Sequence, residues 1–76
     1  GGVDYSYDRE VGQRVRAVRE RRGLTQEQLA ARLQTHDCDI TRSALAKIEA
    51  GQRHIYLFEL RVLREILDVP YENLLP

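Results

Sequence analysis

Apolar residues recur along this chain at the three- and four-residue spacing that marks one face of an α-helix. Val11, Val15 and Val18 follow this spacing near the start, and leucines follow it between residues 57 and 67. Few segments alternate apolar and polar residues, so strands are not expected. The pattern predicts an all-α domain of five helices, with bounds at about 8–22, 26–34, 42–50, 57–67 and, as a final short turn, 71–75.

Two of these helices begin with the same arrangement of polar and apolar residues. Thr25 can cap the second helix, and Gln28 three residues later can complete a capping box. Thr41 can cap the third helix. In both cases an apolar residue before the cap pairs with another at the fourth helical position, which is the spacing of a hydrophobic staple. Two fixed helix starts so close together predict a fixed angle between the second and third helices.

The third predicted helix has an outward face of basic and very small residues. At about 100° per residue, Ala44, Leu45 and Ile48 fall together on the side of the core. The opposite side carries Arg42, Ser43, Ala46, Lys47 and Ala50. Small side chains beside cations let a helix approach a partner closely, and the major groove of B-DNA, about 12 Å wide, admits one α-helix. An ordinary surface helix would carry a similar face, so the neighbouring motifs must decide between the two interpretations.

The charge is balanced over the whole chain but not along it. The 76 residues carry 12 basic and 12 acidic side chains, whereas a basic domain is the usual footprint of nucleic-acid binding. Residues 9–22 hold six arginines against two glutamates, and residues 1–8 and 54–76 each carry two net negative charges. A local basic surface can attract phosphate while the opposite side repels it. We therefore expect modest non-specific affinity for DNA.

Length and composition narrow the class of protein. We expect a single small domain over residues 8–76 preceded by an arm over residues 1–7, whose first two glycines are interpreted as remnants of processing or engineering. No apolar stretch is long enough to span a bilayer and no signal-peptide layout is present, which predicts a cytoplasmic protein. Cys38, His36 and His54 fall short of the four ligands of a structural zinc site, so no metal or cofactor is expected. No catalytic constellation is apparent, so an enzyme is not expected.

Several motifs in order resemble the Cro and lambda-repressor type of helix-turn-helix domain, the Xre family. They are residues 12–19, Gly23–Ala30, Leu45–Arg53 and the leucine-rich stretch 60–75. The resemblance covers nearly the whole chain and implies a compact five-helix domain that binds duplex DNA as a homodimer on a two-fold operator. About five extra residues separate the second and third helices here, so a lengthened turn is expected between them.

The resemblance also implies roles for the matching positions. Base edges would be contacted by Arg42, Ser43, Ala46 and Lys47. Backbone phosphates would be contacted by Thr25, Gln26, Gln52 and Arg53. An internal salt bridge would join Arg19 to Glu49 and tie the first helix to the third.

The fourth predicted helix carries a second apolar stripe, which so small a domain can hardly bury. With the C-terminal leucines it gives a candidate dimer contact made of Phe58, Val62, Ile66, Leu74 and Leu75. The alternative is that Tyr5 and Tyr7 fold back over the stripe. The sequence thus predicts a repressor-like transcriptional regulator that binds specific double-stranded DNA. The alternative function is a protein-binding module, such as an antitoxin component whose main partner is a toxin or another regulator.

Overall fold

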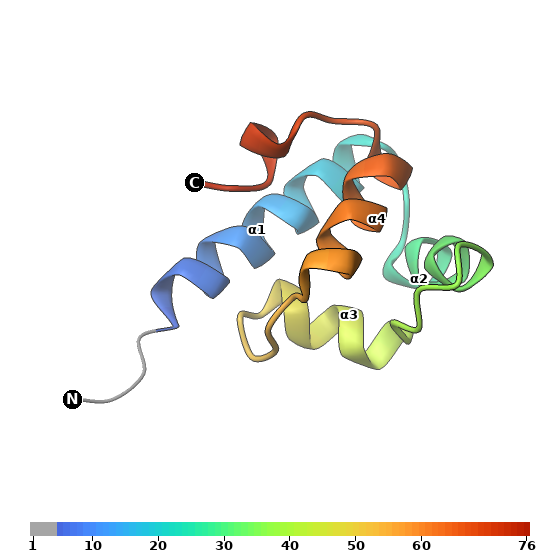
Figure 1. The fold of residues 1–76 in the computed structure, drawn as a ribbon, viewed down its shortest axis with the longest axis horizontal. Helices are drawn as coiled ribbons and strands as arrows, with labels where there is room; N and C mark the ends of the chain where they lie inside the picture. Colours follow the sequence, from blue (N-terminus) through green and yellow to red (C-terminus); the bar gives the residue numbers. More distant parts are fainter. Residues whose placement is uncertain (1–4) are drawn as a thin grey trace.

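The computed structural model describes residues 5–76, which form four α-helices around one core (Figure 1). These are α1 (Ser6–Arg21), α2 (Gln26–Thr35), α3 (Arg42–Glu49) and α4 (Leu57–Leu67), followed by the 3-10 turn η1 (Tyr71–Asn73). The first helix begins two residues earlier than expected. Residues 1–4 lie outside the described part of the chain, and with them the two leading glycines and most of the predicted arm.

The prediction of five helices is wrong, because the last segment forms only a single 3-10 turn. Asp68 takes the left-handed conformation, with φ at 55°, and ends α4. Pro70 follows and cannot donate a backbone hydrogen bond. The chain then closes one turn, in which the N–H groups of Leu74 and Leu75 both donate to the Tyr71 carbonyl at 2.8 Å. Leu74 is fully buried, so this turn places a leucine in the core instead of extending a helix.

The starts of α2 and α3 are fixed by their threonine caps. Thr25 accepts from the Gln28 N–H at 3.0 Å, and its own N–H donates to the Gln28 side chain at 2.9 Å, which completes the capping box. Thr41 accepts from the Ala44 N–H at 3.1 Å. The apolar residues before both caps are buried. These local contacts fix where each helix enters the core.

The lengthened turn between α2 and α3 is anchored to the core by Cys38 and Ile40, which are buried. The Cys38 N–H donates to the Leu33 carbonyl at 3.0 Å and the Asp37 N–H to the Gln34 carbonyl at 3.1 Å. This is a Schellman closure, in which Asp37 takes the left-handed conformation that glycine commonly supplies. Cys38 is buried against the core, and this burial raises the pKa of its thiol. The insertion is therefore anchored inward, and it leaves the outer side of α3 exposed.

The core lies where the four helices meet, and each helix contributes to it. Its fully buried aliphatic side chains are Val15, Val18, Leu29, Leu33, Ile40, Leu45, Ile48, Leu63, Leu67 and Leu74. α1 crosses α3 at Gly12, where an added Cβ would lie 2.2 Å from the Ile48 carbonyl oxygen and 2.9 Å from that of Glu49. A glycine is required there, since the backbone of α3 occupies the place of a side chain. This crossing sets the position of α3 relative to the rest of the domain.

Within residues 5–76, the helices lack the combination of length and apolar character that crossing a membrane requires.

Candidate nucleic-acid interface

α3 lies along one edge of the molecule (Figure 1). Arg42, Ser43 and Lys47 are exposed and Ala46 is half-buried. On the opposite side of the same helix, Leu45 and Ile48 are fully buried in the core and Ala44 packs partly buried against it. The face that the sequence marks as a candidate contact surface is therefore open to a partner.

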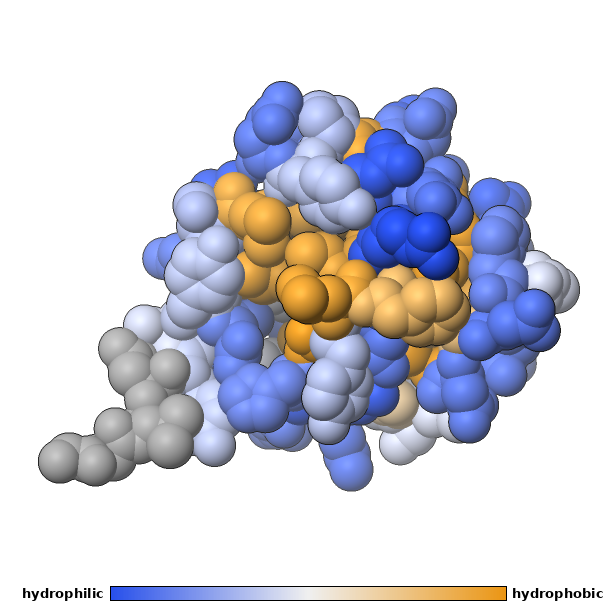
Figure 2. Space-filling view, in the orientation of Figure 1, coloured by the Kyte–Doolittle hydropathy of each residue, from blue (hydrophilic) through white to orange (hydrophobic). Residues whose placement is uncertain are grey.

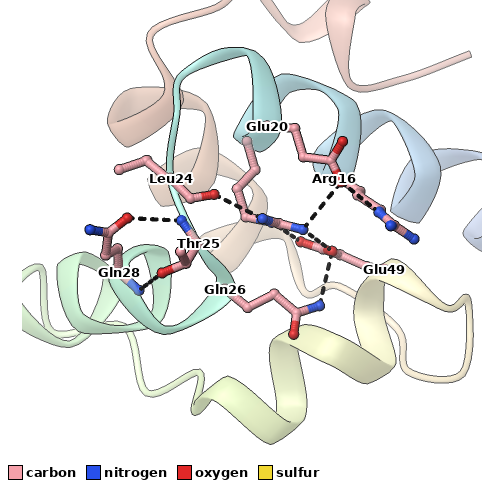
Figure 3. Close-up of polar contacts among 8 residues, drawn as sticks. Arg16, Glu20, Leu24, Thr25, Gln26, Gln28 and Glu49 are labelled. Carbon is pink, nitrogen blue, oxygen red and sulfur yellow. Dashed lines mark hydrogen bonds and ion pairs between the residues drawn. The ribbon is translucent and has the colours of Figure 1, made fainter.

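The N-terminus of α2 lies beside the C-terminal end of α3. The Gln26 side-chain amide donates to Glu49 Oε1 at 3.1 Å (Figure 3). Gln26 is the first residue of α2, so its backbone N–H has no partner within the helix. The hydroxyl oxygen of Thr25 accepts within the capping box, which leaves its proton for a ligand. These groups form a polar edge that adjoins α3.

A buried ion pair holds the two helices and α1 together. Arg19 Nε donates to Glu49 Oε2 at 2.7 Å, and Arg19 Nη2 donates to Oε1 at 2.9 Å. The third nitrogen, Nη1, donates to the Leu24 carbonyl at 2.8 Å, just before the cap of α2. The two side chains are 9% and 4% exposed. Hydrogen bonding to Glu49 raises the pKa of Arg19, so the guanidinium stays charged.

The arginines of residues 9–22, in α1 and at its C-cap, mostly contact other groups of the protein. Four of the six donate hydrogen bonds to protein groups: Arg14, Arg16, Arg19 and Arg22. Arg22 closes the end of α4, because its Nε donates to the Leu67 carbonyl at 2.8 Å and its Nη2 to the Asp68 carbonyl at 2.7 Å. A helix C-terminus leaves such carbonyls without intrahelical partners. Much of the local positive charge seen in the sequence therefore already has hydrogen-bond partners within the protein.

Comparison with known proteins identifies the family. A family model described as a helix-turn-helix domain matches residues 10–74. The chain belongs to the helix-turn-helix domain family. This membership confirms the resemblance at family level. The helix, turn and helix of the family name correspond to α2, the connecting turn and α3.

Solved structures of similar fold agree with this membership. The restriction-modification controller protein C.AhdI from Aeromonas hydrophila superposes with a TM-score of 0.80 at 33% identity, over 92% of this chain and 94% of that one. The DNA-binding domain of BldD gives a TM-score of 0.80 at 23% identity, over 97% and 100% of the two chains. The S. venezulae BldD DNA-binding domain gives 0.76 at 24%, over 92% and 97%. No match was found among curated proteins.

In this helix-turn-helix domain, Arg53 is engaged within the protein. Its two terminal nitrogens each donate to the Glu59 carboxylate at 2.9 Å, and Nη1 also donates to the His54 carbonyl at 2.9 Å. Glu59 in turn accepts from the Tyr56 N–H at 3.0 Å. The hydrogen bonds from Arg53 lower the pKa of Glu59 and keep it ionised. A phosphate contact by Arg53 would compete with this pair, whereas Gln52 beside it is exposed.

The structure buries some residues of the predicted dimer contact and leaves others exposed. Val62 is 2% exposed and Leu74 is 0% exposed, so burial in the core removes both from a contact with a second molecule. Ile66 and Leu75 are partly buried against the core, and Phe58 remains 48% exposed. Two apolar stripes on one helix do not indicate which residues face inward, and in the structure Val62, Leu63 and Leu67 do.

The alternative cover for the stripe, a pair of N-terminal tyrosines, lies elsewhere. Tyr5 stacks on His54, with ring centroids 5.5 Å apart, and His54 Nδ1 lies 2.8 Å from Asp8 Oδ2. Tyr7 lines a hollow at the start of α4, beside Leu57 and Leu60, and both tyrosines remain exposed. The start of α1 is thus joined to the α3–α4 connection.

An apolar surface that the sequence analysis missed surrounds the start of α4. Leu57 is 85% exposed and stands beside a hollow of about 240 Å³. The hollow is lined by Tyr7, Asp8, Val11, Arg53, Ile55, Leu57, Leu60 and Leu75. Figure 2 shows apolar side chains gathered in the middle of this face. A protruding leucine next to an apolar hollow is an unusual feature for a free surface.

Proposed function

We propose that this helix-turn-helix domain binds specific sequences of double-stranded DNA through α3 and regulates transcription. The observation that carries the proposal is the open outer face of α3, with Arg42, Ser43 and Lys47 exposed around the half-buried Ala46. Arginine and lysine are the commonest side chains that read guanine in the major groove, and a small apolar side chain suits a thymine methyl group. The similarity to a restriction-modification controller protein supports a regulatory role. We infer that the protein is not an enzyme.

In this arrangement, α3 lies in the major groove, and the residues around it contact the phosphate backbone of the DNA. Gln26 and Thr25 at the start of α2 contact phosphate on one side, because a helix N-terminus offers free N–H groups to an anion. Gln52, just after α3, contacts phosphate on the other. Arg53 fixes the connection that carries Gln52 through its pair with Glu59. Phosphate contacts set the register of the helix, and base contacts set the preferred sequence.

Loss of either cation on α3 should weaken binding to the preferred sequence more than binding to unrelated DNA. Arg42→Ala and Lys47→Ala are each expected to cost about 1–3 kcal/mol in specific binding, the worth of one good base contact. The measurement is fluorescence anisotropy with a duplex selected from a random pool and with a scrambled duplex. Arg21→Ala is the matched control, because it removes an exposed cation from α1. If Arg42→Ala and Lys47→Ala kept the same ratio of affinities for the selected and scrambled duplexes as Arg21→Ala, the proposal would be contradicted.

We further propose that the regulator acts as a dimer, formed through the surface around Leu57. In a two-fold dimer the same patch meets itself, so each subunit must offer both a protrusion and a hollow. The start of α4 offers both, because the exposed Leu57 stands at the edge of the hollow lined by Ile55 and Leu60. A two-fold axis near Leu57 would seat each leucine in the partner's hollow, and Phe58 would lie beside it.

Leu57→Asp should disrupt this dimer without unfolding the domain, since the side chain is solvent-exposed in one copy. Burial of a leucine contributes about 1.5–3 kcal/mol, and two leucines are lost, so the dissociation constant should rise about 100-fold or more. Sedimentation equilibrium over a range of concentrations measures it. Tyr71→Ala, at another exposed apolar residue, is the control. A wild-type chain that stays monomeric at high concentration would exclude the dimer and would favour the second candidate, a module that binds another protein such as a toxin through this surface.

A further inference from the structure

We propose that Glu49 is a positioning residue, whose buried carboxylate orients the side-chain amide of Gln26 toward DNA phosphate. The inference rests on the proposed function, in which Gln26 contacts the backbone from the start of α2. Figure 3 shows the Gln26 side chain running from the beginning of α2 to the carboxylate at the end of α3. The contact therefore connects the phosphate-binding edge to the helix that reads bases.

The carboxylate determines which way the amide faces. Glu49 Oε1 accepts from Arg19 at 2.9 Å and from Gln26 Nε2 at 3.1 Å. An ionised carboxylate can only accept hydrogen bonds, so the amide must turn its nitrogen, and not its oxygen, toward Glu49. An amide nitrogen carries two N–H groups, and the second remains for a phosphate oxygen. Without Glu49 the amide would rotate freely, and neither of its N–H groups would be held in a fixed direction for a phosphate oxygen.

Arg19 makes this arrangement compatible with an anion nearby. A free carboxylate beside the start of α2 would repel phosphate, but the bidentate pair with Arg19 neutralises it. Arg19 also holds the Leu24 carbonyl at 2.8 Å, directly before the helix cap. One buried pair thus fixes the start of α2, neutralises the charge beside it and orients Gln26. Since Glu49 belongs to α3, the phosphate contact is held in register with the recognition helix.

A double-mutant cycle in DNA binding separates this role from a purely structural one. The ion pair is replaced as a unit in Arg19→Met/Glu49→Leu, because apolar residues of similar volume can replace a buried pair without loss of stability. Gln26→Ala is then made in the wild-type and in the replaced background. Affinity for a mixed-sequence duplex is measured at low salt, since phosphate contacts do not depend on sequence. Gln52→Ala, at a glutamine outside this network, is the matched control in both backgrounds.

We expect Gln26→Ala to weaken binding about three- to tenfold in the wild type, the effect of one hydrogen bond, and by less than about twofold in the replaced background. Gln52→Ala should have the same effect in both. If Gln26→Ala costs the same factor in both backgrounds, or nothing in the wild type, the positioning role is overturned while DNA binding stands. If the wild-type chain binds neither the mixed-sequence nor a selected duplex, the proposed function fails as well.

A second measurement on the wild-type chain does not depend on the replaced variant folding. Side-chain amide ¹⁵N relaxation should show the Gln26 amide group as ordered, whereas that of the exposed Gln13 on α1 should be mobile. Addition of the mixed-sequence duplex should shift the Gln26 amide protons and leave those of Gln13 in place. A Gln26 amide as mobile as that of Gln13 would overturn the proposal.

Discussion

A single methyl group added at Gly12 should destabilise the domain by about 3 kcal/mol, the upper part of the range for overpacking a core. The new Cβ would lie 2.2 Å from the carbonyl oxygen of Ile48 and 2.9 Å from that of Glu49. Both are backbone atoms, so no side-chain rotation can relieve the contact, and α1 and α3 must move apart. Because α3 carries the candidate base contacts, the same change should also weaken DNA binding in the fraction that remains folded.

The sign of this effect makes the test decisive. Gly12 lies inside α1, and helix propensity alone predicts that alanine would stabilise the helix by about 1 kcal/mol. Urea unfolding followed by circular dichroism gives the free energy and the m-value together. Gln13→Ala, at the next and exposed position, should stay within about 0.5 kcal/mol of the wild type. A Gly12→Ala variant as stable as the wild type would contradict the close crossing of α1 and α3.

The parts of the fold that the sequence predicts well are those determined by neighbouring residues. The starts of α2 and α3 depend on Thr25 and Thr41, whose capping bonds span three residues. The end of α4 at Leu67 was likewise predicted from its apolar spacing. The count of five helices was wrong, because the short segment after Pro70 closes only one 3-10 turn.

The contacts that organise the candidate interface are of another kind, because they join residues far apart in the chain. The bond from Gln26 to Glu49 spans 23 residues, and neither residue's neighbours indicate it. The pairing of Arg53 with Glu59 depends on the path of the α3–α4 connection. Exposure of the α3 face follows from helical periodicity, but the use of Gly12 at the crossing does not. Local patterns therefore locate the recognition helix, and tertiary packing decides how it is held.

The second large effect is expected at the ion pair that holds α3. Arg19→Met leaves the Glu49 carboxylate buried without a cation to balance its charge, and breaking a buried pair in this way costs about 3–5 kcal/mol. A domain of 76 residues has a total stability of about 4–11 kcal/mol. The variant should therefore be largely or partly unfolded at ambient temperature. Thermal unfolding followed by circular dichroism would show a strongly lowered midpoint.

The replacement of both partners distinguishes charge from packing as the source of that loss. In Arg19→Met/Glu49→Leu no charge is left unpaired, so most of the stability should return. The hydrogen bonds to the Leu24 carbonyl and to Gln26 are still lost, each worth about 0.5–1.5 kcal/mol, and this sets the remaining deficit. If the double variant were as unstable as Arg19→Met, the pair would act through shape and not through its charges. If the double variant recovered its stability but not its affinity for DNA, the pair would matter for binding. The domain would then be folded but would lack the group that orients Gln26.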